Sequence, residues 1–309
     1  MPKYNLIILH VPGLQSRSDF ETVQRNMVVR APDIEVRIVS YGVRLPPDYW
    51  LVAAQRPSLI FSPQALPIPP GRVRGAQIIS VRLNKLEELQ TMQRAGAPVP
   101  ETVVVEPGTE LDEAKWGPFT VVKPIRGLKG YGVSLMRTKD VRWTDTKLLP
   151  AEDPRHDQVL LAQRYIDTGP YLKSYRVMTV LGRPIYSALS TAVEKRPDHH
   201  LSDAPEMDVA ANNVERQVTL NYDREIIDLA QSIHTKLPHL PSMGIDIVRE
   251  HDTGRLFALE YNSPGGFWHI SSNFGLGQQA KYGLDYKKQF NALDTITDAL
   301  IEATRKRAI

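Results

Sequence analysis

The chain has 309 residues, of which 42% are hydrophobic and 24% are charged, which is typical of a globular protein with room for two or three lobes. Its net charge of +3 is mild and its basic residues are scattered, so we expect no nucleic acid partner, whereas nucleotides remain suitable ligands. The absence of cysteine excludes disulfides, thiolate catalysis and cysteine-based metal sites.

The amino-terminal segment PKYNLIILHVPG places one lysine before a short apolar run. The run is too short for the hydrophobic part of a signal peptide and far too short to span a membrane. We therefore expect a cytoplasmic protein that does not act on a membrane.

Short β-rich runs and one helical stretch alternate over the first 82 residues, which predicts a small open α/β sheet. The runs are 5–10, 35–41, 58–61 and 77–81, and the helical stretch is 19–29. The prolines of SPQALPIPPG, residues 62–71, predict an irregular loop between two of the strands.

A helix is predicted over residues 84–96, NKLEELQTMQRAG. Asn84 is suited to the N-cap, Glu87 stands three residues later as a capping box requires, and Gly96 suits the carboxyl end. A strand bounded by prolines follows at 101–105.

A glycine-rich loop lies between two predicted strands, 119–123 and 133–136. Glycines at 127, 130 and 132 let backbone amides approach an anion, and positive charge comes from Lys123, Arg126 and Lys129. The spacing fits neither GxxxxGK[ST] nor GxGxxG, and a strand follows the loop rather than a helix. The pattern predicts a phosphate-covering flap of the strand-loop-strand kind, and an ordinary surface turn is the alternative.

Further strands are predicted at 159–166 and in a hairpin of 175–181 with 184–189, and helices at 223–237 and 286–307. Between them, the polar span 191–217 shows no clear period and is long enough to suggest a functional or disordered connection. It contains Lys195, Arg196, His199 and His200. Adjacent histidines on a strand point apart, so a metal site there is disfavoured.

The segment GIDIVREHDTGRLFALEYNSPGG, residues 244–266, predicts two antiparallel strands joined by a tight turn at 251–254. Glu260 and Asn262 share one face of the second strand, and Asp246 lies opposite or diagonal to them. Two carboxylates and an amide oxygen suit magnesium, which fills its other positions with water and phosphate. Acidic residues on strands are also often merely solvated, which is the alternative.

The order of these motifs resembles the ATP-grasp superfamily, and within it the RimK-type ligases. The resemblance covers residues 84–266, through NKLEELQTMQRAGAPVPET, FTVVKPIRGLKGYGV, VLLAQRYID, SYRVMTVLGRPIYSA and the 244–266 segment. It implies an α/β protein of ATP-grasp architecture with a small open α/β domain at the amino terminus. The expected division is an amino-terminal domain at 1–82, a small lobe with the flap at 83–160, and a carboxyl-terminal lobe with the metal hairpin at 161–309.

The resemblance also implies roles for individual residues. Lys85 and Lys123 would contact the nucleotide phosphates under the mobile flap of Arg126, Gly127, Gly130 and Gly132, and Arg176 would face the transferred phosphoryl group. The hinge between lobes would be Gln163, Arg164, Tyr165 and Ile166, with main-chain atoms of Arg164 and Ile166 turned to the adenine. Asp246, Glu260 and Asn262 would hold magnesium, with manganese as a possible substitute.

The implied activity is ATP-dependent ligation of a carboxylate to an amine through an acylphosphate, with release of ADP and phosphate. Its substrates would be ATP, a carboxylate and an amine, from small molecules or peptides, and the chain could form a homo-oligomer. Alternatives are a kinase-like ATP-grasp enzyme and a nucleotide-binding protein without turnover. The chain departs from the RimK-type pattern in two places, on the substrate and nucleotide-rim side. It reads STAVEKRPDHHLSD where the subgroup has paired arginines, for which Lys195 and Arg196 are candidate substitutes, and it has Ser174 where the subgroup has an acidic residue near the ribose.

Overall fold

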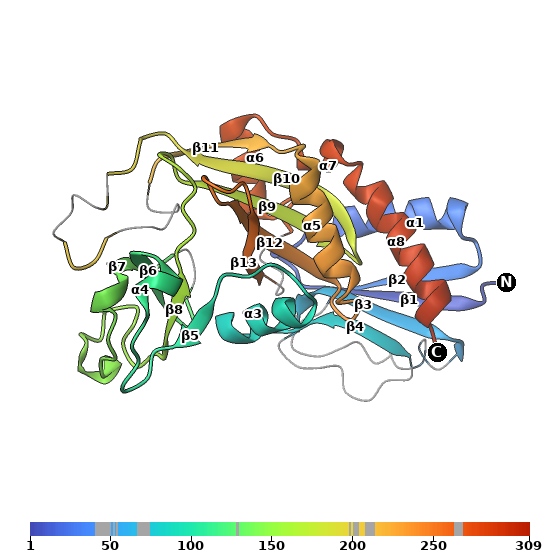
Figure 1. Cartoon of the computed structure of the whole chain (residues 1–309). Coiled ribbons are helices and arrows are strands. Elements are labelled where there is room, and N and C mark those ends of the chain that lie inside the picture. The colour runs from blue at the N-terminus through green and yellow to red at the C-terminus, as the bar shows by residue number, and fades with distance from the viewer. Residues whose placement is uncertain are drawn as a thin grey trace.

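The structure is a computed structural model. It describes residues 1–40, 51, 53, 55–66, 75–127, 130–197, 199, 204–207, 214–262 and 268–309. Three sheets organise these residues: a parallel sheet at the right of Figure 1, an antiparallel sheet at the left, and a larger antiparallel sheet between them. The chain is therefore a mixed α/β protein, as predicted.

The amino-terminal sheet has strand order β2-β1-β3-β4, and its described pairings are all parallel. Its central strand β1 is buried along six of its seven residues, as expected for a parallel strand covered on both faces. The elements are β1 (Tyr4–His10), α1 (Arg17–Arg30), β2 (Ile34–Ser40), β3 (Ser58–Ala65) and β4 (Ala76–Ser80).

The expected loop at 62–71 is wrong in its first part, because β3 continues through Pro63 to Ala65. The pairing of β3 with β4 shifts register between Ser62 and Ala65. A strand accommodates a proline at such an irregularity because no ladder hydrogen bond is required there. Residues 67–71 of the expected loop lie outside the described residues.

The small antiparallel sheet has order β5-β8-β6-β7. The helix before it, α3, begins after the N-cap Asn84, whose side chain and that of Glu87 form the predicted capping box. The elements are α3 (Lys85–Arg94), β5 (Thr102–Val104), α4 (Glu113–Trp116), β6 (Phe119–Pro124), β7 (Ser134–Arg137), β8 (Leu160–Arg164) and two short 3₁₀ turns, η1 (Thr138–Asp140) and η2 (Thr146–Leu148).

The central sheet is antiparallel, in the order β11-β10-β9-β12-β13. Helix α5 packs on β9 and β10 through an apolar face that includes Ile226, Ala230 and Ile233. The elements are β9 (Lys173–Val180), β10 (Arg183–Ala192), β11 (Arg216–Leu220), α5 (Arg224–Thr235), β12 (Ser242–Arg249), β13 (Leu256–Asn262), α6 (Asn273–Tyr282), α7 (Tyr286–Gln289) and α8 (Ala292–Arg307).

The single helix predicted for 286–307 is wrong, because the structure divides it into α7 and α8. Asn291 adopts a left-handed conformation with φ of 49°, which interrupts the helix and serves as the N-cap of α8. Helix α8 then packs against α1 and β10, which places the carboxyl terminus on the amino-terminal sheet (Figure 1).

One hydrophobic core joins the parallel sheet to the central sheet. It contains Leu6 and Phe61 from the first, Tyr186 from the second, and Trp268 and Leu300 from the carboxyl-terminal segment.

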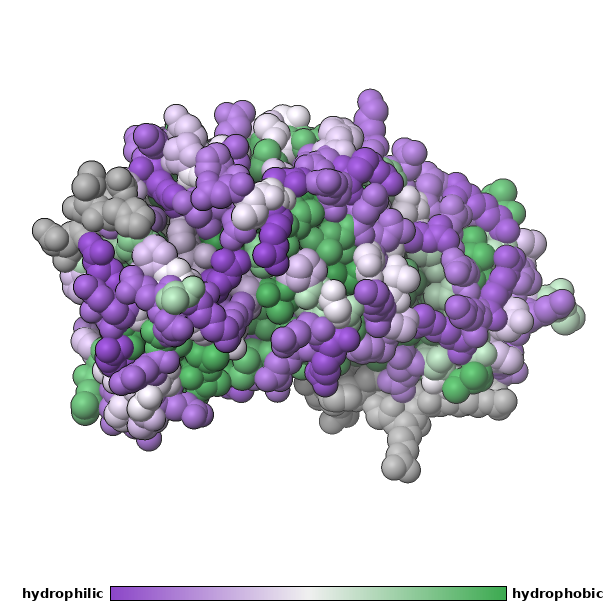
Figure 2. Space-filling view, in the orientation of Figure 1, coloured by the Kyte–Doolittle hydropathy of each residue, from purple (hydrophilic) through white to green (hydrophobic). Residues whose placement is uncertain are grey.

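The division of the chain into three parts at residues 82 and 160 remains a prediction. Among the described residues, no helix is both long and apolar enough to cross a membrane, and the face drawn in Figure 2 is mostly hydrophilic.

Candidate functional site

Three charged residues stand side by side across the central sheet. Asp246 on β12 is paired with Arg176 on β9 and with Glu260 on β13. Directly opposite residues of antiparallel strands share one face, so the three side chains project together. We call Arg176, Asp246 and Glu260 the charged row.

Arg176 and Asp246 form a two-pronged ion pair. Arg176 Nε lies 2.7 Å from Asp246 Oδ1, and Nη2 lies 2.6 Å from Oδ2. Asn262 donates to the same Oδ2 from Nδ2 at 3.4 Å, so its own carbonyl oxygen remains an available acceptor. The register of β12 and β13 shifts directly after Asp246, as a bulge beside a functional site often does.

Lys85 reaches the charged row from the first turn of α3. Its Nζ lies 3.9 Å from Glu260 Oε2 and donates to the carbonyl oxygen of Gly127 at 2.8 Å. One ammonium therefore contacts the predicted metal hairpin and the first glycine of the flap. Lys85, Gly127 and Glu260 belong to three separate motifs of the sequence, and the structure brings them together.

Lys123 on β6 is buried, with 6% of its surface exposed, and donates from Nζ to Gln163 Oε1 at 3.0 Å. Gln163 in turn donates to Thr102 Oγ1 at 3.0 Å. Burial lowers the pKa of Lys123 to about 8, although the Glu260 carboxylate favours the charged form. Gln163 was expected to be a hinge residue, and here its side chain also orients a candidate phosphate ligand.

A further acidic residue, Glu88, was not among the residues predicted from the sequence; it lies one helical turn after Lys85 and is 7% exposed. Burial raises its pKa to about 9, and the nearby Glu260 carboxylate adds to the effect. Its spacing from Lys85 was a usable signal, because residues three apart on a helix share a face. Its burial depends on how α3 packs on β13, which the sequence does not reveal.

The two carboxylates of the charged row differ in their electrostatics. Burial raises the pKa of Asp246 even though the Arg176 guanidinium opposes this. Burial acts in the same direction on Glu260, but Lys85, Lys123 and Arg176 outweigh it and lower the pKa of Glu260. These three neighbouring cations therefore keep Glu260 ionised at neutral pH, as a metal ligand must be.

The expected strands of the flap are present. β6 and β7 pair antiparallel from Phe119 with Arg137 to Val122 with Ser134. At the loop, Gly130 and Gly132 have φ of 78° and 72°, a region that favours glycine, while Arg126 is exposed. A Cβ on Gly132 would lie 3.1 Å from Arg155 Cγ. Lys129 lies outside the described residues.

The hinge segment connects β8 to the central sheet. Arg164 pairs with Glu250 at 3.2 Å and its guanidinium lies 5.0 Å from the ring centroid of Phe257. Ile166 is buried beside Phe257, and the Tyr165 hydroxyl accepts from Arg196. The Arg164 main-chain N–H donates to Glu101 O at 2.8 Å, so this atom is already satisfied within the protein.

Two described residues of the 191–217 span, Met207 and His199, contact the small sheet. Met207 and Leu135 exchange two backbone hydrogen bonds of 2.9 and 2.8 Å at the edge strand β7. His199 is buried, with ring centroids 5.8 Å from Phe119 and 6.2 Å from Tyr165. His199 therefore packs between aromatic rings, and His200 lies outside the described residues.

The donor set of the hairpin fits magnesium. Glu260 offers its carboxylate, Asn262 its amide oxygen, and Asp246 a carboxylate oxygen that it would share with Arg176. Within the described part of the chain, no group of three or more histidine, aspartate or glutamate side chains could hold a metal by itself. Such an incomplete set suits a cation that completes its shell with water and phosphate.

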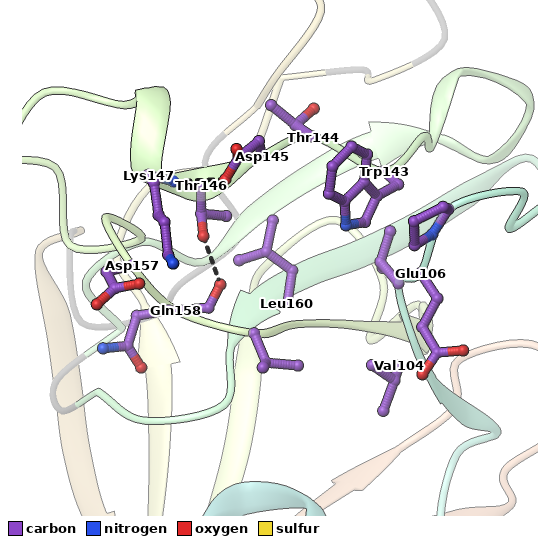
Figure 3. Close-up of a pocket in the computed structure, with 13 residues that line it drawn as sticks. Val104, Glu106, Trp143, Thr144, Asp145, Thr146, Lys147, Asp157, Gln158 and Leu160 are labelled. Carbon is purple, nitrogen blue, oxygen red and sulfur yellow. Dashed lines mark hydrogen bonds between the residues drawn. The ribbon is translucent and has the colours of Figure 1, made fainter.

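A separate cavity of about 320 Å³ lies on the small sheet, lined by Trp143, Glu106, Asp157 and Leu160 among others (Figure 3). Thr146 Oγ1 donates to Gln158 O at 2.8 Å beside it. None of the predicted site residues lines this cavity, so it belongs to neither the flap nor the charged row.

No protein-family model matches the sequence, and none of the curated proteins does. Among solved structures, D-cycloserine synthetase DcsG superposes with a TM-score of 0.52 at 15% identity, over 97% of this chain and 99% of that one. The ATP-grasp ligase PsnB with its minimal precursor gives 0.48 at 15% identity, over 98% and 100%. D-alanine–D-alanine ligase from Bacillus anthracis gives 0.48 at 14% identity, over 98% and 99%.

The chain has the ATP-grasp fold, as the order of its motifs implied. The likeness to D-cycloserine synthetase DcsG extends over nearly the whole length of both chains, so the amino-terminal sheet is included in it.

Proposed function

We propose that this protein is an ATP-dependent carboxylate–amine ligase of the RimK type. It would form an amide through an acylphosphate and release ADP and phosphate. The observation that carries the proposal is that Lys85 contacts both Glu260 of the charged row and Gly127 of the flap, while the buried Lys123 lies close enough to Glu260 to act on its charge.

The charges present suit a bound nucleotide. Lys85, Lys123 and Arg176 supply three cations, and the carboxylates of Asp246 and Glu260 supply two anions beside them. Cations stabilise the charge that spreads over the γ-phosphoryl oxygens during transfer. When bound at Asp246, Glu260 and Asn262, magnesium would add charge neutralisation at the β- and γ-phosphates.

The chemistry requires no protein nucleophile. The substrate carboxylate attacks the γ-phosphorus, and the bond to the bridging oxygen breaks to release ADP. The amine then attacks the acyl carbon of the acylphosphate, the carbon–oxygen bond to phosphate breaks, and the nitrogen loses a proton as the amide forms. Lys123 is held toward the site by Gln163, and Lys85 is tied to the first flap glycine, so closing the flap over a nucleotide would draw a cation with it. A closed flap also excludes the water that would hydrolyse the acylphosphate.

The test is incubation with ATP, magnesium, and pools of carboxylates and amines, with hydroxylamine as the trap. The proposal expects ADP together with a hydroxamate of one carboxylate, and neither product from Glu260→Gln. ADP formed without a hydroxamate would indicate a kinase-like transfer to another acceptor. Nucleotide binding without ADP in every pool would indicate a binding protein without turnover.

A further inference from the structure

A second cavity, of about 430 Å³, opens where the loop between β1 and α1 meets the segment that carries α6 and α7. This volume is in the range of small-molecule sites. The cavity lies beyond the carboxyl end of a parallel strand, where ligands of open α/β sheets bind. Its polar lining includes Gln15, Ser16, Ser18, Ser271, Asn273 and Lys287.

A buried carboxylate on α1 joins that helix to the segment that carries α6 and α7. Asp19 is 1% exposed and accepts from Trp268 Nε1 at 2.9 Å, from Lys287 Nζ at 2.6 Å and from the Ser271 hydroxyl. Ser271 Oγ accepts in turn from the main-chain N–H of Ser16 at 3.2 Å. These bonds satisfy Asp19 and fix the residues that line the cavity.

Gln15 provides an unused donor. It is 5% exposed and lines the cavity, and its Nε2 has no hydrogen-bond partner among the described residues. The orientation of the amide is determined chemically: the N–H of Val11 donates to Oε1 at 3.3 Å, and an NH₂ group could not accept that bond. The unused atom is therefore a donor, and its partner must be an acceptor.

The surroundings of Gln15 favour an anionic acceptor. The 14-residue helix α1 begins at this cavity, and no helix carbonyl can accept from the N–H groups of Arg17 and Ser18 in its first turn. The N-cap Ser16 makes no side-chain capping bond. A helix amino terminus carries partial positive charge, and Lys287 on the rim balances Asp19 beneath it.

The cavity is connected to the charged row through two stacked rings. Tyr286, the residue before Lys287, stacks on Tyr186 of β10 at 4.3 Å between ring centroids. Tyr186 pairs with Met178 on β9, which is two residues from Arg176 and therefore on the same face of the strand. Asn262, at the end of the hairpin, and Trp268, which donates to Asp19 beside the cavity, are only six residues apart in the chain. The distance between them is therefore at most about 20 Å.

We propose that this cavity binds an oxyanion, a carboxylate or a phosphate group, of a substrate whose reacting group lies at the charged row. Gln15 Nε2 and the first-turn amides of α1 donate to it. The substrate assignment rests on the proposed ligase function, whereas anion binding in the cavity is a property that can be measured without ATP.

The test uses ¹⁵N-labelled protein without nucleotide, titrated separately with glutamate, malonate and inorganic phosphate to about 20 mM, a range that detects weak binding. The side-chain amide signal of Gln15 is the one that Gln15→Glu removes. That variant keeps an acceptor for Val11 and places a negative charge where the donor was. Gln231→Glu, on the exposed face of α5, adds the same charge elsewhere.

The expected result is a saturable shift of the Gln15 signal with at least one probe, and affinity for that probe weakened about tenfold or more in Gln15→Glu but unchanged in Gln231→Glu. A response to glutamate or malonate identifies a carboxylate site, and a response to phosphate alone identifies a phosphate site. No shift with any probe, or equal affinity in Gln15→Glu, would overturn the proposal. Binding of an ATP analogue to Gln15→Glu at wild-type affinity separates this outcome from failure of the nucleotide site.

Discussion

Arg176 and Asp246 lie opposite one another on β9 and β12 and are joined by two charge-assisted hydrogen bonds of 2.7 and 2.6 Å. The guanidinium therefore has a fixed orientation before any substrate arrives. The Arg176 side chain as a whole is 31% exposed. Such preorganisation reduces the reorganisation needed in the transition state.

Arg176→Gln should lower turnover by about 10²-fold, the typical cost of removing one transition-state donor. It should also reduce the free energy of unfolding by about 1–3 kcal/mol, because the buried Asp246 carboxylate loses its partner. Chemical denaturation and steady-state ADP release measure the two effects. In Arg176→Gln with Asp246→Asn, stability should recover, because no buried carboxylate is left unpaired; unchanged turnover in the single variant Arg176→Gln would show that Arg176 acts only structurally.

ATP affinity should be constant below pH 8 and should fall as the pH rises through about 8. The Lys123 ammonium, with its pKa of about 8, loses its charge in this range. A bound phosphate raises that pKa, so binding near pH 8 should take up protons. Calorimetry in buffers of different ionisation enthalpy measures this uptake. Lys123→Met should abolish it, and proton release on binding would contradict the assignment.

Glu88→Gln should preserve ATP affinity at pH 7, because the wild-type carboxyl, with its pKa of about 9, is already neutral there. Above pH 9 the wild-type group ionises and repels phosphate, so the variant should lose affinity less steeply than the wild type. The same calorimetric pH series measures the difference. Tighter binding of the variant at pH 7 would instead show that Glu88 is ionised in the free protein.

Lys85→Ala should weaken ATP binding by about tenfold or more, the usual value of a hydrogen bond to a charged group. It should also loosen the flap, because Lys85 Nζ holds the carbonyl oxygen of Gly127. Lys115→Ala is the matched control, since this lysine of the small lobe is 62% exposed and pairs with Glu101. Equal affinities in the two variants would exclude Lys85 from the phosphate site.

Gly132→Ala should destabilise the protein by more than Gly254→Ala. Both glycines have left-handed backbones, with φ of 72° and 69°, which costs a non-glycine residue about 1–2 kcal/mol. At Gly254 an added Cβ meets nothing within 4 Å, whereas at Gly132 it meets Arg155 and Pro154 at 3.1 and 3.2 Å. Thermal unfolding of both variants measures the difference, and equal losses would show that the flap loop adapts.

Local patterns were sufficient for most of the fold. The capping box at Asn84 and the alternation in 244–262 predicted α3 and the β12–β13 hairpin, because both signals depend on neighbouring residues. The break at Asn291 could not be predicted, because its left-handed backbone follows from how α7 and α8 pack separately on β10.

The site was less accessible to sequence reasoning. The proposed ligands Asp246, Glu260 and Asn262 interrupt apolar strands, a pattern that is visible in the sequence, but the burial of Glu88 requires the packing of α3 on β13. The cavity at Gln15 brings together residues about 260 positions apart, and sequence spacing carries no record of such a contact.

The most direct test of the magnesium and nucleotide site is the affinity for a non-hydrolysable ATP analogue with and without magnesium, in the wild type and in Glu260→Gln. Magnesium should strengthen binding to the wild type by about tenfold or more, since the hairpin carboxylates would hold the cation and it would neutralise phosphate charge. Glu260→Gln should lose this gain while still binding the free analogue through Lys85 and Lys123. The same magnesium dependence in both proteins would contradict the account.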